Sequence, residues 1–376
     1  MNSAVDQVRS HLLRAAELPR AVRSSGVVGD QARLQLQRES QAELAGAGAV
    51  VQPLLDDPAV TDVLVNGDAG VWVDRGAGLQ REVESSIPDS RALATRLATL
   101  AGQRLDDAVP IVDGTLPDGS RLHAVLAPVA AEGAQISLRT VRRQAFSLPE
   151  LQRRGFLDPQ GADLIRQLVQ VRANVLVSGA TGAGKTSLLA CALSLVPSDE
   201  RIVCIEEAAE LTPNHPHVVH LQVRRPNVQG AGGIDLPTLV RTAMRMRPDR
   251  LVLGECRGAE VREVLGALNT GHDGGWATVH ANSSDDVPAR LVALGALAGL
   301  SPTAVAMQAQ AAIDAVLHLR RTGDGTRVLH QVGVLIPATS GGQMLCEPAL
   351  RRGRGGELQR AEQWPVLQAR LERPDG

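Results

Sequence analysis

A glycine-rich segment near the middle of the chain limits the folds open to this sequence more than any other feature. The segment is Gly179-Ala-Thr-Gly-Ala-Gly-Lys-Thr186, and it matches the phosphate-binding pattern G-x-x-x-x-G-K-[ST]. An apolar run at 174–178 precedes it, and an apolar helical stretch at 186–193 follows it. The main-chain amides of such a loop turn toward phosphate oxygens, and the next helix adds partial positive charge. The segment therefore predicts a strand, a phosphate-binding loop and a helix in succession.

The lysine of this loop is the only lysine in the chain. Of the 39 basic residues, 38 are arginine and one is Lys185. This distribution indicates a site whose chemistry requires a compact ammonium rather than a guanidinium. We expect Lys185 to contact the β and γ phosphates of ATP and the Thr186 hydroxyl to bind Mg²⁺. The residues predicted to bind the nucleotide are Gly179, Ala180, Thr181, Gly182, Ala183, Gly184, Lys185, Thr186 and Ser187.

Two further apolar strands are predicted to end in carboxylates. Leu251-Val-Leu-Gly-Glu255 has the form of a Walker B element, which would place Glu255 near Mg²⁺ and the attacking water. The second strand ends in Glu206 and Glu207. Strand ends line the ligand crevice of open α/β sheets, so either acid can point at the γ-phosphate. From spacing alone, a solvated strand end explains these two acids equally well.

Histidines and arginines add candidates whose interpretation stays open on the sequence alone. His280 follows a short predicted strand, and a lone histidine in that position is typical of a satisfied core or surface residue. The cluster of His215, His217 and His220 would suggest a metal site, but its Asn-His-Pro-His setting is more typical of a loop entering a strand. Arg241 and Arg245 are predicted on one face of a helix at 236–247. They could form a solvated face, a DNA-binding patch or arginines that reach phosphates.

Hydrophobic periodicity divides the chain into a smaller α+β domain and a larger domain of alternating strands and helices. Continuous apolar runs in the larger domain predict strands buried on both faces of a parallel sheet, in a doubly wound α/β core. A hairpin is predicted across 315–336. The predicted divisions are a helical N-terminal arm at 1–50, an α+β domain at 51–139, a linker at 140–150, a P-loop ATPase domain at 151–340 and a C-terminal tail at 341–376. About the last 25 residues are rich in Arg, Gly and Glu, and we expect them to be ordered weakly or by a partner.

Composition limits the kinds of partner and the cellular compartment that we expect for this protein. The net charge of −2 argues against extensive nucleic-acid binding. The four cysteines are scattered, which is typical of buried, reduced thiols in a cytosolic protein. The first 20 residues lack the apolar core of a signal peptide, and the apolar stretch at 291–300 is too short to span a bilayer. We therefore expect a cytoplasmic protein that reaches the membrane through a partner.

In order and spacing, these elements resemble the type II/type IV secretion traffic ATPases, specifically the CpaF-like branch of tight-adherence (Flp) pilus motors. That family carries a Walker A element, an acidic Asp box, a Walker B element of the form G-E-x-R-G and a His box of the form G-H-x-G-x-x-x-T-x-H-A-N. The resemblance extends over residues 55–340, although the Asp box commonly reads Glu-Asp where this chain has Glu206-Glu207. The matching segments are Gly179–Thr186, Glu206–Leu211, Gly254–Gly258, Gly271–Asn282 and Arg241–Arg250.

The resemblance implies a RecA-like P-loop NTPase domain in a homo-hexameric ring, with ATP bound between the two domains. Hydrolysis would rotate one domain against the other about 140–150 and drive an inner-membrane platform protein, without direct contact to nucleic acid. Glu255 would position Mg²⁺ and the water, Glu206 would act as a second acid or base, and His280 would sense the γ-phosphate. The arginines implied at the phosphates are Arg121, Arg139, Arg245 and Arg104.

Two alternatives compete with a motor for pilus assembly or secretion. A conjugation or DNA-transfer ATPase of a sister branch would require hydrolysis stimulated by DNA. The near-neutral charge and the 1% aromatic content argue against that alternative. Proteins bind single-stranded nucleic acid in basic grooves and by stacking its bases on aromatic side chains. A scaffold that binds nucleotide without hydrolysing it is the second alternative.

Overall fold

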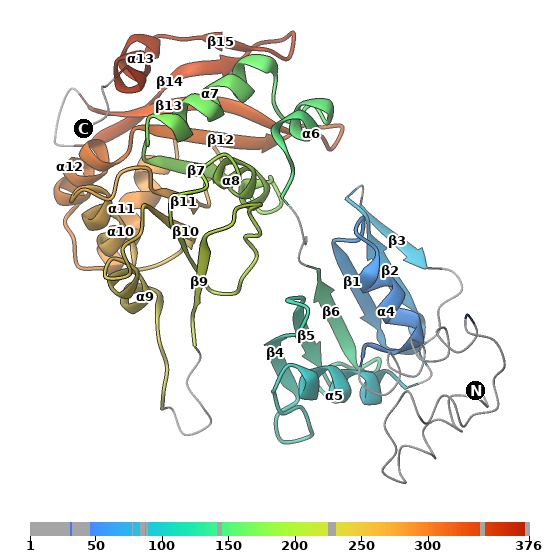
Figure 1. The fold of residues 1–376 in the computed structure, drawn as a ribbon. Coiled ribbons are helices and arrows are strands. Elements are labelled where there is room, and N and C mark those ends of the chain that lie inside the picture. The colour runs from blue at the N-terminus through green and yellow to red at the C-terminus, as the bar shows by residue number, and fades with distance from the viewer. Residues whose placement is uncertain are drawn as a thin grey trace. The chain divides into compact units, whose positions relative to one another are not determined.

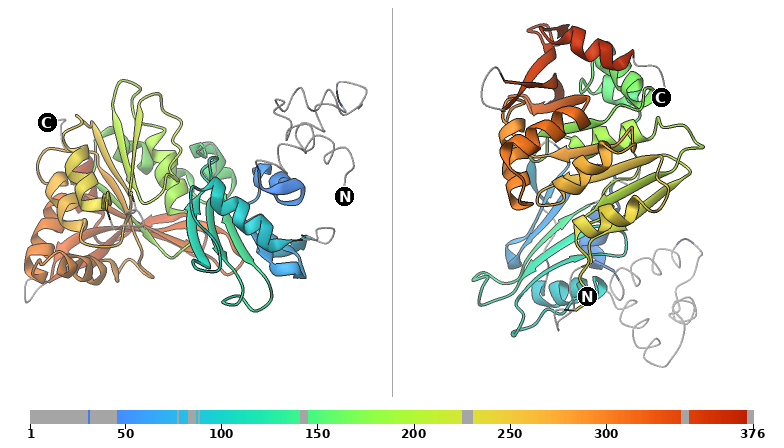
Figure 2. Two further views of the ribbon diagram at one scale, coloured as in Figure 1. Left: turned by 90° about the horizontal axis from the view of Figure 1, so that it is seen from below. Right: turned by 90° about the vertical axis from the view of Figure 1, so that its left-hand side faces the viewer.

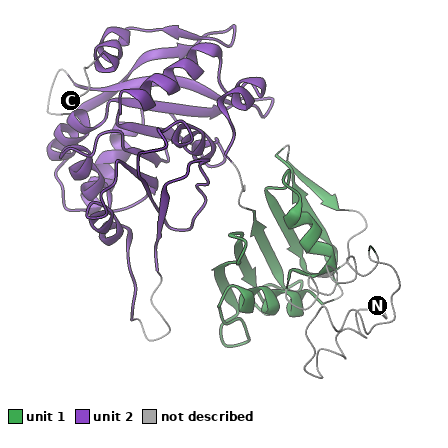
Figure 3. Ribbon diagram, viewed as in Figure 1, with its two compact units in different colours: residues 1–143 green, residues 144–376 purple. Residues whose placement is uncertain are grey.

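A computed structural model describes residues 31, 46–76, 78–82, 87, 89–140, 145–224, 231–338 and 343–372. The chain forms two compact units, unit 1 at 1–143 and unit 2 at 144–376, and each is described by itself (Figure 3). The division between Arg143 and Gln144 lies inside the predicted linker. Almost all of the predicted helical arm at 1–50 lies outside the described residues.

Unit 1 contains an antiparallel sheet in the order β3-β2-β1-β6-β5-β4 (Figure 1). Alternate side chains such as Val63 and Val65 are buried in its core with Leu93 and Leu97 from a helix. The smaller domain contains helices and an antiparallel sheet, which agrees with the α+β domain that the sequence predicts. The elements are α4 Gly48–Asp56, β1 Asp62–Asn66, η1 Gly67–Ala69, β2 Val71–Asp74, β3 Leu79–Glu82, α5 Ser90–Leu100, β4 Ile111–Thr115, β5 Arg121–Val125 and β6 Gln135–Arg139.

Unit 2 is built on one large mixed sheet. Among the described residues its order is β15-β14-β13-β12-β7-β11-β10-β8-β9, and the strands from β12 to β9 run parallel. The strands are β7 Val175–Gly179, β8 Ile202–Glu206, β9 Val218–Gln222, β10 Arg250–Cys256, β11 Trp276–Val279, β12 Ala315–Arg321, β13 Arg327–Pro337, β14 Met344–Arg352 and β15 Leu358–Arg360. The predicted parallel core and the predicted hairpin, now β12 and β13, are confirmed.

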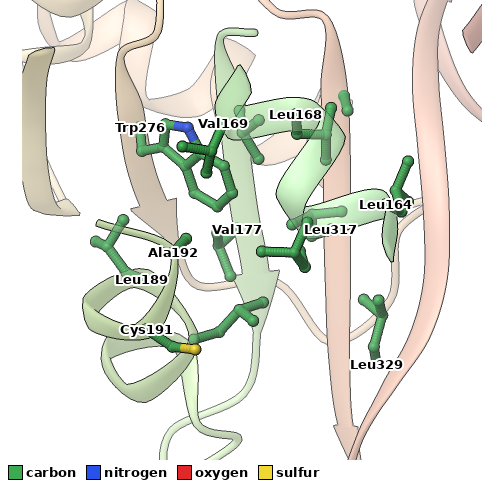
Figure 4. Close-up of a cluster of buried hydrophobic side chains, with 14 of the residues drawn as sticks. Leu164, Leu168, Val169, Val177, Leu189, Cys191, Ala192, Trp276, Leu317 and Leu329 are labelled. Atoms are coloured by element: carbon green, nitrogen blue, oxygen red, sulfur yellow. The ribbon is translucent and has the colours of Figure 1, made fainter. Parts of the chain in front are cut away.

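Helices cover both faces of this sheet, as the two views in Figure 2 show. Because side chains alternate along a strand, Val175 and Val177 pack on one face and Leu176 on the other. On the first face α7 and α8 pack over the central strands, with Leu168 and Trp276 in the same buried cluster (Figure 4). The helices of unit 2 are α6 Leu148–Arg153, α7 Pro159–Gln170, α8 Lys185–Leu193, α9 Leu236–Ala243, α10 Val261–Leu268, α11 Val287–Leu297, α12 Pro302–Ala312 and α13 Trp364–Leu371.

The prediction that about the last 25 residues of the tail at 341–376 are ordered weakly or by a partner is wrong for the described residues up to 372, which form regular structure within this chain. Strands β14 and β15 extend the sheet beyond β13, and α13 packs through the buried Leu367. The Arg370 guanidinium donates to the carbonyl of Asp314 at 2.6 Å, which fixes α13 beside the start of β12. The Arg, Gly and Glu residues that suggested disorder occupy the β14–β15 turn and exposed positions. The structure therefore extends the P-loop unit past the predicted boundary at 340.

All four cysteines are buried, as predicted. Burial raises the pKa of the Cys191 thiol to about 12 and raises the pKa of the Cys204 thiol further still. Such thiols stay protonated at neutral pH and behave as small apolar side chains.

Within the described part of the chain, no single helix is long and apolar enough to cross a membrane. Helices α11 and α12 pass the length and composition test only together, and the chain bends by 119° between them.

His318 makes the stability of unit 2 depend on pH. Its ring is buried in β12, and Nδ1 lies 3.0 Å from the Ser178 hydroxyl of β7. Burial, assisted by the charges of His330 and Arg320, lowers the pKa of His318 to about 4, against 6.5 for an ordinary histidine. A proton therefore binds the unfolded chain first, so stability present above pH 6.5 is lost as the pH falls toward 4.

We expect this single group to remove about 3 kcal/mol from the free energy of unfolding between pH 7 and pH 4. Urea unfolding of the wild type and of His318→Gln across this range measures the effect. The wild type should lose more stability than the variant as the pH falls. Equal losses in the two proteins would contradict the assignment to His318.

Candidate nucleotide-binding site

The site lies at the carboxyl edge of the parallel strands. Strand β7 ends at Gly179, β8 at Glu206, β10 at Cys256 and β11 at Val279. Because these strands are parallel neighbours, the residues that follow them meet at one edge of the sheet. The sheet thereby brings together the four motifs that the sequence separates by up to about 100 residues.

The phosphate-binding loop joins β7 to α8, as predicted. Gly184 adopts φ +99°, and a Cβ at this position would lie 2.7 Å from the Phe156 ring, so only glycine fits. Helix α8 begins at Lys185 without a side-chain cap. Its first amides have no partner within the helix and are the groups that a phosphate would accept from. Thr181 and Gly182 are exposed, so a ligand can approach the loop from solvent.

Lys185 is a buried cation held by neutral groups. Its side chain is 7% exposed, and Nζ donates to the carbonyl oxygens of Gly179 at 2.8 Å and Ala180 at 2.9 Å. Burial lowers the pKa of Lys185, and the negative charge of Glu255 partly opposes this shift. Within the described residues Lys185 makes no ion pair at 4.0 Å or less. The ammonium is oriented but not neutralised, which fits an anionic ligand at this loop.

Glu255 and His280 lie beside this lysine. Glu255 Oε1 is 2.9 Å from His280 Nε2, and His280 Nδ1 is 3.5 Å from Lys185 Nζ. Burial, followed by the positive charge of Lys185, lowers the pKa of His280 below its usual value. The ring is therefore neutral at pH 7 and can donate one hydrogen bond while its other nitrogen accepts one. The structure brings Lys185, Glu255 and His280 together, as the resemblance implied.

Glu206 is buried on the neighbouring strand. Oε1 accepts from the amides of Glu210 and Leu211, both at 3.0 Å. Oε2 is buried, has no hydrogen-bond partner among the described residues and lies 3.7 Å from His220 Nδ1. Glu206 therefore anchors the turn that follows β8 and keeps one oxygen uncommitted. Its role as a second acid or base stays a prediction.

Gly254 leaves the space that Glu206 occupies. A Cβ on Gly254 would lie 2.8 Å from Glu206 Cγ, and the two main-chain bonds to Oε1 prevent this side chain from moving aside. We expect Gly254→Ala to destabilise the fold by about 1–3 kcal/mol, as overpacking does. The matched control is Gly266→Ala in α10, where a Cβ meets nothing within 4 Å and alanine favours the helix. Thermal unfolding should separate the two variants, and equal melting temperatures would contradict this account of Gly254.

The arginines of the segment 241–250 have different environments. Arg241 donates to Glu263 Oε1 of α10 at 2.8 Å. The buried Arg250 pairs with Glu200 at 2.5 Å near the start of β10, away from the edge that carries the P-loop. Helix α9 ends at Ala243, so Arg245 is exposed in the following turn. The expectation that Arg241 and Arg245 share one helical face is wrong, because the helix ends before Arg245. The amide of Arg245 donates to the carbonyl oxygen of Thr242, three residues back, instead of continuing the α-helical pattern.

Three of the predicted arginines belong to unit 1. Arg121 in β5 and Arg139 in β6 are directly opposite each other in the sheet. Arg139 Nε lies 3.0 Å from Asp62 Oδ1, and Arg104 Nε lies 2.5 Å from Asp106 Oδ2. A role for these side chains at a phosphate stays a prediction.

The histidines at 215–220 lie where a loop enters β9, as predicted. His217 Nε2 is 2.7 Å from an Arg201 nitrogen, and His215 Nε2 is 2.9 Å from the carbonyl oxygen of Pro197. These contacts account for both side chains as structural residues.

Two site residues received no role from the sequence. Arg257 contacts both Glu255 and Glu207, with Arg257 Nη2 donating to Glu255 Oε2 at 2.8 Å and Nη1 to Glu207 Oε2 at 3.1 Å. The buried Glu260 accepts from the amides of Arg257 at 2.6 Å and Gly258 at 2.8 Å. The only sequence signal was the place of Arg257 in the G-E-x-R-G motif, two residues after Glu255.

The family model for type II/IV secretion system proteins matches residues 44–356. A Mycobacterium tuberculosis (H37Rv) protein, provisionally named a conjugal transfer protein, is 50% identical over 317 residues, which cover 82% of this chain and 90% of that protein. Conjugal transfer protein TrbB of Sinorhizobium fredii, also a provisional name, is 32% identical over 282 residues and covers 73% of this chain and 83% of its own length.

A solved structure, that of the ATPase DotB from Legionella pneumophila, aligns with a TM-score of 0.55 at 19% identity. The alignment covers 85% of this chain and 82% of DotB. At this identity the likeness shows the fold alone, which is the mixed α/β fold described above. The family model and the Mycobacterium relative each match most of the chain, and residues 44–356 of the family match include all four motifs of the site. The chain belongs to the type II/IV secretion system protein family.

Proposed function

We propose that this protein hydrolyses ATP with Mg²⁺ and that hydrolysis powers a secretion or pilus-assembly machine. The observation that carries the proposal is the buried ammonium of Lys185, oriented by two carbonyl oxygens and paired with no carboxylate among the described residues. It stands at the uncapped N-terminus of α8, where amides and charge both favour an anion. A triphosphate satisfies both groups at once.

The neighbouring residues have separate parts in the proposed reaction. The amides of the loop and Lys185 bind the β and γ phosphates, and the Thr186 hydroxyl with Glu255, through water, would hold Mg²⁺. The ion would neutralise phosphate charge. Glu255 orients the attacking water, and the neutral His280 contacts both Glu255 and Lys185, so it can respond to the γ-phosphate. Glu206 serves as a second acid or base through its uncommitted oxygen.

The finer proposal is a homo-hexameric motor of the CpaF-like, tight-adherence branch with a RecA-like ATPase domain. In it, Arg121, Arg139 and Arg245 reach nucleotide phosphates, and an inner-membrane platform protein receives the motion at the inner face of the membrane. The motif spacing from Gly179 to Asn282 supports this branch.

Conjugal DNA transfer is the second candidate function. It is favoured by two relatives that are named conjugal transfer proteins, one of them 50% identical to this chain. Its motor would use the same hydrolytic site, so the two candidates differ in what stimulates turnover.

A stimulation assay distinguishes the candidates. The purified full chain is assayed for phosphate release alone, with single- and double-stranded DNA, and with vesicles of anionic phospholipid, and its mass is measured by light scattering with and without ATP. The pilus or secretion motor predicts an ATP-stabilised hexamer that lipid stimulates and DNA does not. Stimulation by DNA alone would favour conjugal transfer, and a chain that stays monomeric with ATP would contradict the ring.

A further inference from the structure

Arg257 makes a two-pronged contact with the carboxylate of Glu255. It lies just after β10, with Nε 2.7 Å from Glu255 Oε1 and Nη2 2.8 Å from Glu255 Oε2. Only the Nη2 contact is a hydrogen bond, and the guanidinium charge lies close to both oxygens, so the pair restricts the orientation of the carboxylate. The third nitrogen, Nη1, donates to Glu207 Oε2 at 3.1 Å. One guanidinium therefore links the acid near the end of β10 to the acid that follows β8.

The backbone of Arg257 is held by the side chain of Glu260. Glu260 is 4% exposed, and its Oε1 accepts from the amides of Arg257 and Gly258. The loop between β10 and α10 is thereby closed over a buried carboxylate, and the Arg257 side chain projects from it toward Glu255. This loop presents the guanidinium in a defined place rather than on a freely moving segment.

The contacts leave one oxygen of Glu255 without a hydrogen bond among the described residues. Oε1 lies 2.7 Å from Arg257 Nε and 2.9 Å from His280 Nε2, but it is buried and has no hydrogen-bond partner among the described residues. Oε2 faces Arg257 Nη2 and keeps one lone pair open. Arg257 therefore holds the carboxylate through Oε2, while Oε1 keeps its acceptor capacity for a water.

We propose that Arg257 is a positioning residue for hydrolysis, which aims Glu255 at the attacking water and is itself held by Glu207. This inference rests on the proposed ATPase function. Arg257 acts through Glu255 and not on the nucleotide, so its loss should affect kcat and leave KM for ATP nearly unchanged. Arg257 and Glu207 are both about half exposed, and exposed ion pairs add little to folding, so the variants should fold.

The test compares Arg257→Ala, Arg257→Lys, Glu207→Gln and the double variant Arg257→Ala/Glu207→Gln by steady-state phosphate release. We expect kcat to fall about 10- to 100-fold in Arg257→Ala, since misorientation of a reacting group costs that much. Arg257→Lys should recover part of the loss with a single donor. Glu207→Gln should have a smaller effect, and the double variant should be no slower than Arg257→Ala, because Glu207 acts only through Arg257.

The matched control is Arg166→Ala. Arg166 in α7 pairs with Asp163, and its side chain is 47% exposed, as is that of Arg257. Its kcat and melting temperature should equal those of the wild type.

Three results would overturn the inference while leaving the ATPase function intact. These are an unchanged kcat in Arg257→Ala, a loss confined to KM, and additive losses in the double variant. If Arg257→Ala does not fold, Arg257→Lys carries the same test. A wild type that hydrolyses no ATP would instead refute the proposed function itself.

Discussion

Replacement of Lys185 by alanine is expected to abolish ATP hydrolysis and to weaken ATP binding by about two to three orders of magnitude. The variant removes the one ammonium of the loop, which the Gly179 and Ala180 carbonyls hold at 2.8 and 2.9 Å. No other lysine can replace it, because Lys185 is the only lysine in the sequence. Binding of a fluorescent ATP analogue and phosphate release measure the two effects separately.

Lys185→Arg is the informative companion, because it retains the charge and changes its shape. A planar guanidinium needs more room than an ammonium, and position 185 is buried, with 7% exposure. The guanidinium also fits the two carbonyl oxygens that accept from Lys185 poorly. We expect this variant to lose most turnover as well. Circular dichroism and thermal unfolding control for folding of both proteins. Near-normal turnover in Lys185→Ala would contradict the assignment of the loop as the nucleotide site.

Glu255→Gln is expected to lower kcat by about 10²- to 10⁴-fold and to leave ATP binding largely intact. The amide keeps the size of the side chain but loses the negative charge that Arg257 pairs with and that a water would donate to. The result expected is therefore a protein that binds ATP and turns over very slowly. Single-turnover phosphate release, with binding measured in parallel, shows whether the loss lies in the chemical step.

Glu206→Gln is the comparison that separates the two acids. The amide oxygen of glutamine can still accept from the amides of Glu210 and Leu211, so the turn after β8 should persist. We expect turnover to fall about tenfold, less than for Glu255→Gln, because only the second acid or base is lost. A larger loss in Glu206→Gln than in Glu255→Gln would reverse the two roles.

The central part of the fold was predictable because its signals are local. Strands β7, β8, β10 and β11 are continuous apolar runs, and only a parallel sheet covered on both faces buries such runs completely. The loop from Gly179 to Lys185 has a sequence that few other structures require. Once these strands are parallel, the approach of Glu255 and His280 to Lys185 follows from the topology.

The parts that were missed depend on contacts distant in sequence. Burial in strand β14 alternates only from Met344 to Glu347, and arginines and glycines dominate the composition of the region around it. Strand β14 is ordered by its pairing with β13, and the local sequence does not predict that pairing. Arg257 was overlooked for the same reason, because its partner Glu207 lies 50 residues away. The helix end at Ala243 was misplaced because an apolar pattern continues through Met244 and Met246.

The most direct measurement of the central claim is a titration of the purified full chain with ATP in the presence of Mg²⁺, followed by an assay for released phosphate. Saturable binding and steady phosphate release, both lost in Lys185→Ala, are the predicted result. A folded wild type that neither binds nor hydrolyses ATP would contradict the account.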